Sequence, residues 1–190
     1  YACNGTLIDF GSGSNIYFWL IAFRHIEKVL CVDISKEAFF INEQIRKKKL
    51  YPKSCEYALK KYNKEFDEVL KTEVNYLIYD VLYSSINSTI KYNNVSQFGL
   101  LGLCKSEKEY ISNLEKLYNL LKKGGTLLGA NWCFSTSYSK KMGFNNNYLS
   151  EKMIQDFGEK QNCKILYVKK VLIINDPNYD SVLIYAIKHE

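Results

Sequence analysis

Short apolar runs alternate along the chain with longer segments that carry apolar residues at helical spacing. The apolar runs predict buried strands at residues 6–10, 29–33, 74–81, 95–104 and 126–133. The segments with helical spacing predict helices at residues 16–25, 35–49, 53–71, 106–123 and 150–157. Two last strands, residues 163–174 and 182–188, are joined by a turn too short for a crossover, so they are predicted to be antiparallel neighbours.

This alternation predicts an α/β fold, in which helices cover a mostly parallel sheet. Serines precede three predicted helices at Ser35, Ser106 and Ser150, where a hydroxyl can cap the first turn. The chain has no internal repeat and no linker, so residues 1–190 are expected to form a single domain. Because it begins at Tyr1 without methionine, we expect a fragment that lacks an N-terminal segment.

A glycine-rich turn follows the first predicted strand, and the candidate ligand-binding residues lie in and around it. Asp9 precedes Gly11-Ser12-Gly13, an apolar helix starts at Ile16, and the second strand ends in Asp33. Glycine adopts backbone angles closed to other residues and lets a ligand approach the main chain. This order is the layout of a nucleoside-binding βαβ unit, in which the acid accepts hydrogen bonds from ribose hydroxyls. A structural turn with a capping serine is the alternative.

The nucleoside is predicted to be S-adenosyl-L-methionine (SAM) rather than a dinucleotide. A dinucleotide fingerprint has a third glycine, which lets the helix pack close to a pyrophosphate, where this chain has Ile16. SAM has no phosphate, and Asp9 two residues before Gly11 fits it. We therefore expect a Rossmann-like class I SAM methyltransferase with a seven-stranded, mostly parallel sheet, an antiparallel last strand and helices on both faces. An NAD-dependent oxidoreductase is the disfavoured alternative.

Composition and charge limit the kinds of partner that this chain is expected to bind. The net charge of +6 comes largely from lysines in helical runs at residues 46–49 and 60–64, which indicate solvated faces rather than a nucleic-acid surface. The longest apolar stretch, residues 16–23, is far shorter than the ~20 residues of a membrane span. The six cysteines are scattered without a C-x-x-C pair, which predicts no metal site and a reducing, cytoplasmic location. We expect a monomer that binds a small-molecule methyl acceptor.

Several segments together resemble a known family. LIDFGSGSNIY, LCVDIS, LYNLLKKGGTLLGANW and the loop FSTSY are similar to the nicotinamide, phenylethanolamine and thioether methyltransferases. The resemblance runs from Thr6 to the last strand and is closest to the nicotinamide N-methyltransferase branch. It implies transfer of a methyl group from SAM to a nitrogen, or a sulfur, of a small molecule such as a pyridine or an amine.

The resemblance also implies roles for individual residues. Those expected to bind the cofactor are Asp9, Gly11, Ser12, Gly13, Tyr17, Asp33, Asp80, Val81, Gln97 and Phe98. Those expected to bind the acceptor are Asn131, Ser135, Tyr138 and Asp180, with Asp176 less clearly placed, and Asn131 and Tyr138 are the predicted catalytic pair. From spacing alone, Asp80 equally fits a cap on the next turn, and Asn131 equally fits the end of a strand.

The chain departs from the family at three points. Asn131 stands where nicotinamide-type members have an aspartate, so we predict a neutral acceptor, because an amide gives no charge attraction for a cationic amine. Ala38 stands where the family commonly has an asparagine after the ribose acid, and we expect the family's N-terminal lid to belong to the segment that this fragment lacks. These departures keep open a second function, a catalytically weak or inactive protein with a SAM-binding fold.

Overall fold

The computed structural model describes residues 1–23, 25–86 and 89–190. Its strands are β1 (Gly5–Phe10), β2 (Ile26–Asp33), β3 (Glu73–Ile78), β4 (Tyr92–Phe98), β5 (Leu121–Phe134), β6 (Lys164–Leu172) and β7 (Tyr179–Lys188). They form one seven-stranded sheet in the order β3-β2-β1-β4-β5-β7-β6. β7 runs antiparallel to both of its neighbours, and the other pairs are parallel. The predicted fold class is confirmed.

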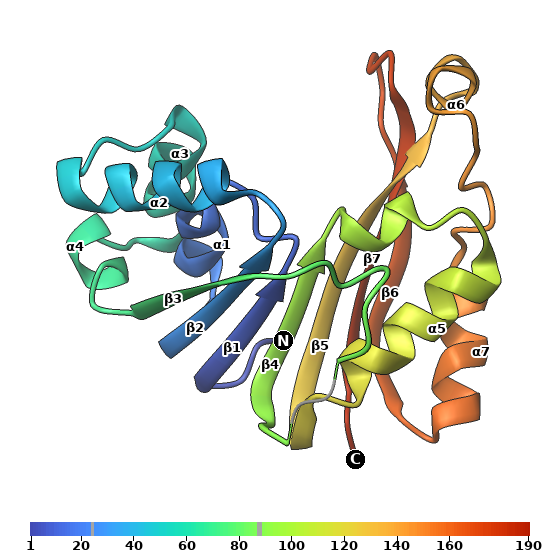
Figure 1. The fold of residues 1–190 in the computed structure, drawn as a ribbon, viewed down its shortest axis with the longest axis horizontal. Helices are drawn as coiled ribbons and strands as arrows, with labels where there is room; N and C mark the ends of the chain where they lie inside the picture. Colours follow the sequence, from blue (N-terminus) through green and yellow to red (C-terminus); the bar gives the residue numbers. More distant parts are fainter. Residues whose placement is uncertain (24, 87–88) are drawn as a thin grey trace.

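Helices cover the two faces of the sheet (Figure 1). The helices are α1 (Ile16–Ala22), α2 (Lys36–Lys48), α3 (Lys53–Tyr62), α4 (Phe66–Val69), α5 (Glu107–Tyr118), α6 (Thr136–Met142) and α7 (Glu151–Gln161), with a 3-10 turn η1 at Leu100–Leu103. Side chains of a strand alternate between faces. Accordingly, Leu7 packs in the apolar cluster with α1–α4, while Ile8 and Phe10 pack in the cluster with α5 and α7. Both faces of β1 are buried.

The three predicted serine caps are confirmed. The hydroxyls of Ser35, Ser106 and Ser150 accept hydrogen bonds from the backbone N–H three residues later, at 3.1, 3.2 and 3.2 Å. Each thereby satisfies a donor that the first turn of a helix leaves unpaired. On α5 the carboxylate of Glu109 reaches back to the N–H of Lys105, one residue before the capping serine.

Several predicted boundaries were wrong. The predicted helix at 53–71 is two helices, separated at Asn63, which has a left-handed φ of 49°. The predicted helix at 106–123 ends at Tyr118, and Lys122 already belongs to β5. Residues 135–138, predicted as a loop, cap and begin α6. Of the predicted helix 16–25 and the predicted loop 83–94, residues 24 and 87–88 lie outside the described part of the chain, and residues 92–94 belong to β4.

Candidate cofactor and acceptor sites

A cavity of about 560 Å³ opens at the carboxyl ends of β1, β2, β3 and β4. In open α/β sheets ligands bind in this crevice. The arrowheads of β1, β2, β4 and β5 point to this edge in Figure 1. The lining residues come from five segments and are Gly11, Val32, Asp33, Ile34, Tyr79, Asp80, Val81, Leu82, Tyr83, Phe98, Gly99, Leu100, Leu103, Lys105, Met142 and Phe144. The volume is within the range of small-molecule sites.

The glycine turn and Asp33 are held together by main-chain hydrogen bonds. Gly11 and Gly13 have φ of +67° and +61°, angles that side chains disfavour. Asp33 accepts hydrogen bonds from the N–H of Gly13 at 2.9 Å and from the N–H of Ser35 at 3.0 Å. The two bonds use different carboxylate oxygens, so each oxygen keeps a lone pair for a ligand hydroxyl. The Cβ of residue 13 would meet no atom within 4 Å, which leaves open space above the turn.

Asn42 also holds the turn and was not predicted. Its amide donates to the carbonyl of Gly13 at 2.8 Å, and its oxygen accepts from the N–H of Ile16 at 3.1 Å. Asn42 is buried on α2, between Ala38 and Ile45 at helical spacing. A lone polar residue on the apolar stripe of a helix was the signal that could have found it, because such a residue needs a buried partner.

Asp9 is buried beneath the turn. One carboxylate oxygen accepts a hydrogen bond from Ser96 at 2.5 Å, and the other has no partner among the described residues. Burial raises the pKa of Asp9 to about 7, the Ser96 hydrogen bond lowers it, and the charge of Asp33 raises it further. The Ser12 hydroxyl is likewise buried without a partner that meets hydrogen-bond geometry. Such orphaned groups fit a polar ligand placed on the turn.

Three further residues predicted to bind the cofactor lie in different surroundings. Asp80 lines the cavity and also caps the turn after β3, accepting from the N–H of Leu82 at 3.1 Å. Both interpretations of its spacing therefore fit the structure. Val81 lines the cavity beside it, almost fully buried. Tyr17 instead points into the core, where its ring packs edge-on against Phe66 and burial raises its pKa to about 12.

Gln97 and Asn131 face the core rather than the cavity. Their amides bond to each other at 2.8 and 3.0 Å, and both side chains are fully buried. Tyr110 donates to the Asn131 oxygen at 2.7 Å, and Gln97 donates to the Tyr185 hydroxyl at 2.8 Å. The cause is strand alternation, which turns both residues to the face covered by α5. With its oxygen and nitrogen bonded in this network, Asn131 does not reach the cavity.

The other acceptor residues gather around the start of α6. Ser135 caps this helix and donates to the carbonyl of Pro177 at 2.9 Å. The Tyr138 ring packs against Phe134 and Tyr179, at centroid distances of 5.1 and 5.5 Å. Asp180 lines a neighbouring hollow of about 520 Å³ together with Phe134. Asp176, in the turn before β7, accepts from the N–H groups of residues 178 and 179.

Asn146 connects three segments around the cavity and was also missed. Its amide donates to the carbonyls of Gly102 and Trp132, and its oxygen accepts from the N–H of Phe134, at 2.8–3.0 Å. The loop that carries Phe144 is thus joined to η1 and β5. Asn146 lies in the run Asn145–Asn147, and no spacing distinguishes it from its neighbours.

No family model and no curated protein sequence matches the chain. Solved structures match it by their fold. The N-methyltransferase NodS from Bradyrhizobium japonicum WM9, in complex with S-adenosyl-L-homocysteine (SAH), has a TM-score of 0.63 at 11% identity and covers 99% of this chain and 79% of its own. Magnesium protoporphyrin IX methyltransferase from Synechocystis PCC 6803, with bound SAM, has a TM-score of 0.59 at 13% identity and covers 97% and 69%.

A third neighbour comes from the complex between the Haloferax volcanii Trm112 methyltransferase activator and a putative methyltransferase. It has a TM-score of 0.64 at 11% identity and covers 98% of this chain and 83% of its own. These likenesses agree with the strand order described above. The chain has the class I methyltransferase fold.

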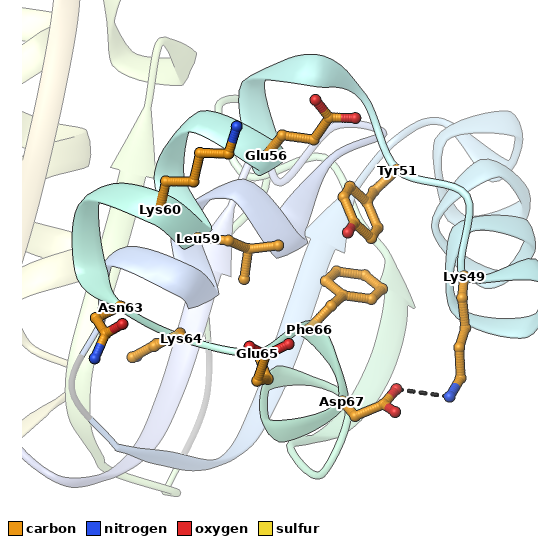
Figure 2. Close-up of a pocket in the computed structure, with 10 residues that line it drawn as sticks. All are labelled: Lys49, Tyr51, Glu56, Leu59, Lys60, Asn63, Lys64, Glu65, Phe66 and Asp67. Carbon is orange, nitrogen blue, oxygen red and sulfur yellow. Dashed lines mark ion pairs between the residues drawn. The ribbon is translucent and has the colours of Figure 1, made fainter.

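A second hollow lies away from the carboxyl ends of the strands. A hollow of about 670 Å³ lies between α2, α3 and α4 and shares no lining residue with the cavity (Figure 2). Figure 2 shows charged side chains of both signs around the facing rings of Tyr51 and Phe66, and an ion pair of 2.6 Å joins Lys49 and Asp67. We assign the ligand site to the cavity at the strand ends, because the glycine turn and Asp33 lie there.

Within ranges 1–23, 25–86 and 89–190, no three His, Cys, Asp or Glu side chains are grouped so as to hold a metal ion. None of the helices described there has the length and apolar character needed to cross a bilayer. The six cysteines are free thiols, four of them buried.

Proposed function

We propose that this chain is a SAM-dependent methyltransferase that acts on a small molecule. One observation carries the proposal: Asp33 accepts the hydrogen bond of Gly13 and fixes the glycine turn at the edge of a 560 Å³ cavity. A carboxylate with lone pairs to spare beside a bare turn of main chain suits the ribose and the amino-acid part of SAM. The likeness to methyltransferases with bound SAM or SAH supports this choice.

The other cavity residues have proposed roles consistent with their positions. Asp80 and Val81 would lie against the adenine, with Ile34 and Phe98 as apolar contacts. Asp9 and Ser12 would provide polar groups beneath the turn. SAM supplies an activated methyl group on a positively charged sulfur. The protein's own contribution is to align two ligands, and orientation effects of this kind are worth roughly 7–11 kcal/mol.

The acceptor is proposed to be a neutral nitrogen compound. A lone pair on nitrogen attacks the methyl carbon in line with the departing sulfur, and no protein base is needed if the nitrogen carries no proton. Ser135, Tyr138 and Asp180 are the proposed acceptor residues that remain near the site, since Asn131 is held in the core. Membership of the nicotinamide N-methyltransferase branch, and a cytoplasmic location, remain parts of the proposal.

Calorimetric titration with SAH tests the cofactor. We expect saturable binding with one site, and a loss of at least tenfold in affinity for Asp33→Ala, because two main-chain contacts and the ribose contact disappear together. Asp156→Ala is the matched control, since this carboxylate is exposed on α7 and pairs with Lys152. Absence of heat with the unaltered chain, or equal affinity in both variants, contradicts the proposal. The same titration with NAD tests the alternative of an NAD-dependent oxidoreductase.

A binding protein without turnover is the second candidate, and the buried Asn131 favours it. Of the two residues that the resemblance assigns to catalysis, Asn131 has its side-chain oxygen and nitrogen hydrogen-bonded within the core. A screen of radiolabelled methyl transfer to pyridines, amines and thioethers separates the two candidates. SAH binding together with methyl transfer to any of these compounds supports the enzyme. SAH binding with no transfer to any of them supports the binding protein.

A further inference from the structure

The positive charge of the chain is concentrated in one segment. Residues 46–64 hold eight lysines and arginines against a single acidic residue, Glu56, which gives the segment a net charge of +7. The whole chain carries +6, so the other residues together are close to neutral. The segment comprises the end of α2, the linker that follows it and α3, and in Figure 1 these lie at one end of the molecule, remote from α6 and α7.

The outer side of α3 carries lysines and a tyrosine. Its inner side is packed against the protein through three buried residues, Cys55, Ala58 and Leu59. Lys53, Tyr57 and Lys61 follow one another at intervals of four residues, so they lie on one face of the helix, opposite the buried side. All three side chains are exposed.

Large apolar side chains are exposed among these lysines. Leu50, in the linker between α2 and α3, is 72% exposed, and Tyr57 is 67% exposed. The ammonium group of Lys61 lies 6.0 Å from the centre of the Tyr57 ring. An exposed leucine has no solvation advantage, so its place in the most basic part of the chain needs an explanation. We call Lys47, Lys48, Leu50, Lys53, Tyr57 and Lys61 the basic face.

The charge of the basic face is not neutralised within the protein. Its four lysines form no ion pair with any residue that the structure describes. The nearby acids Glu56, Glu65 and Asp67 surround the hollow of Figure 2, which no residue of the basic face lines. The helix dipole favours Lys48 at the end of α2 but disfavours Lys53 at the start of α3. Intramolecular electrostatics therefore do not account for this cluster.

We propose that the basic face binds the surface of a lipid bilayer that contains anionic phospholipids. The inference does not depend on the proposed function. Clusters of roughly four to eight lysines and arginines attract anionic headgroups. Apolar side chains between such lysines add affinity by entering the boundary between headgroups and acyl chains. Leu50 favours a bilayer over a nucleic acid, because a leucine side chain neither stacks on bases nor forms hydrogen bonds with them.

Binding in this orientation leaves the cofactor cavity accessible. No residue of the basic face lines the cavity, which opens at the carboxyl ends of the strands. The bilayer would contact α3 and the linker before it, whereas the cavity is formed by β-strand ends, η1 and the loop after α6. The two surfaces can therefore be occupied together.

Sedimentation with vesicles tests the proposal. The probes are vesicles of phosphatidylcholine alone and vesicles with about 30% phosphatidylserine, an anionic lipid of the kind that basic clusters attract. We expect the chain to bind the anionic vesicles at least tenfold more tightly. Raising the salt from about 0.1 M to about 1 M shortens the screening length from ~10 to ~3 Å, so most of this binding should be lost. Equal binding to both kinds of vesicle, or none to either, would overturn the proposal.

Paired lysine variants separate a local surface from net charge. The combined change Lys53→Ala and Lys61→Ala is expected to weaken binding to the anionic vesicles at least tenfold. The control, Lys108→Ala with Lys164→Ala, removes the same charge from exposed positions on α5 and β6, and is expected to weaken binding less than twofold. Equal losses in the two double variants would show attraction by net charge alone and would overturn the proposal.

Leu50→Asn tests the apolar contact and distinguishes a bilayer from a nucleic acid. It leaves every charge in place and is expected to weaken vesicle binding at least fivefold. A single-stranded oligonucleotide, titrated at the same salt, is the competing probe. Tighter binding to the oligonucleotide than to the anionic vesicles, with no effect of Leu50→Asn, would assign the basic face to nucleic acid and overturn the proposal.

This proposal and the proposed function fail independently. The affinity for SAH is expected to stay within twofold in all these variants, because none of the altered side chains lines the cavity. Absence of SAH binding contradicts the proposed function and leaves the vesicle result unaffected. Circular dichroism at the temperature of the assay shows that each variant is folded, as expected for changes at exposed positions.

Discussion

Asp9 lies at the end of β1 with one carboxylate oxygen bonded to Ser96 and the other without a partner in the described residues. Burial holds its pKa in the folded chain at about 7, against an ordinary value of 3.8. The folded state therefore binds more protons than the unfolded state between these two pH values. By linkage, the contribution of this group to stability falls as the pH rises from about 4 to about 7.

The first prediction is that Asp9→Asn flattens the pH dependence of stability. A single group that is protonated in the folded state and ionised in the unfolded state changes the free energy of unfolding by up to ~1.4 kcal/mol per pH unit. We expect the variant to lose much of this slope between pH 4 and 7 and to be the more stable protein at pH 8. Urea unfolding at several pH values measures it, with Asp156→Asn as the exposed control. A slope identical to that of the unaltered chain contradicts the burial of Asp9 as described.

The second prediction concerns Asn42, which holds the glycine turn from α2. Asn42→Ala removes partners from the carbonyl of Gly13 and the N–H of Ile16. Because leaving buried groups unsatisfied costs roughly 1–3 kcal/mol each, we expect a loss of about 2–4 kcal/mol of stability. Lys47→Ala, an exposed change on the same helix, is expected to stay within about 0.5 kcal/mol. Urea unfolding compares the two variants, and equal midpoints would contradict the role of Asn42 in holding the glycine turn.

Elements with a local signal were predictable from the sequence. The strand runs, the serine caps of α2, α5 and α7, and the glycine turn all depend on neighbours within a few residues. The errors arose where distant pairing decided the structure. The helix predicted at residues 106–123 would end just before Gly124, yet Gly124 and Gly125 form reciprocal main-chain hydrogen bonds with His189 from within β5, at 2.7 and 2.9 Å. Strand pairing with the C-terminal end of the chain overrides the local signal.

The short helix α6 had no pattern to reveal it. None of its seven residues is buried, so no apolar periodicity exists, and a run of serines and threonine indicates a loop equally well.

The face on which a strand residue lies was the other unpredictable feature. Strands covered on both faces are apolar throughout, so their sequence does not tell which face a polar residue takes. Asp9 and Ser96 turn toward the α1 face, and Asn131 and Gln97 turn toward α5. The predicted cofactor loop could therefore be located from sequence, whereas the roles of Asn131 and Gln97 could not.

The third prediction tests a cap at the scale of the element. Ser106 accepts the N–H of Glu109 at the start of α5. Replacing a capping serine by alanine costs about 1 kcal/mol. Ser112→Ala, at an exposed position within the same helix, replaces serine by a better helix former and is expected to be neutral or slightly stabilising. Thermal unfolding of the two variants gives the comparison, and a Ser106→Ala chain as stable as Ser112→Ala would contradict the cap.

At the scale of the whole molecule, a buried network connects β4, β5, β7 and α5. Gln97, Asn131, Tyr110 and Tyr185 contribute one side chain from each element. Gln97 also accepts the N–H of Leu101, so the network reaches η1, and Leu100 there packs against Gly11. Burial and the neighbouring Tyr185 hydroxyl hold the pKa of Tyr110 well above its usual value, which keeps it a neutral donor.

The fourth prediction is that Gly129→Ala disrupts this network. A Cβ at residue 129 would overlap the ring of Tyr185, which is fully buried and cannot move away. Overpacking of a core typically costs about 1–3 kcal/mol and more where the backbone must shift. Gly102→Ala is the control, since its Cβ would meet its nearest neighbour at 3.6 Å, an ordinary contact. Urea unfolding is expected to show a large loss for the first variant and a small change for the second.

The cavity is built from five separate segments, so a ligand that fills it should stabilise the entire sheet rather than one loop. A ligand at one hundred times its dissociation constant adds about 2.7 kcal/mol to the free energy of unfolding. In a chain of this size that corresponds to a rise in Tm of roughly 5–11 °C. We expect SAH to produce such a rise in one cooperative transition, and Asp33→Ala to remove most of it at the same ligand concentration.

A rise in Tm that survives Asp33→Ala unchanged would mean that SAH binds elsewhere, and the hollow between α2, α3 and α4 would then be the site to examine. A biphasic transition would mean that the five segments do not unfold together, because a ligand contacting only one cooperative unit cannot shift the melting of the other.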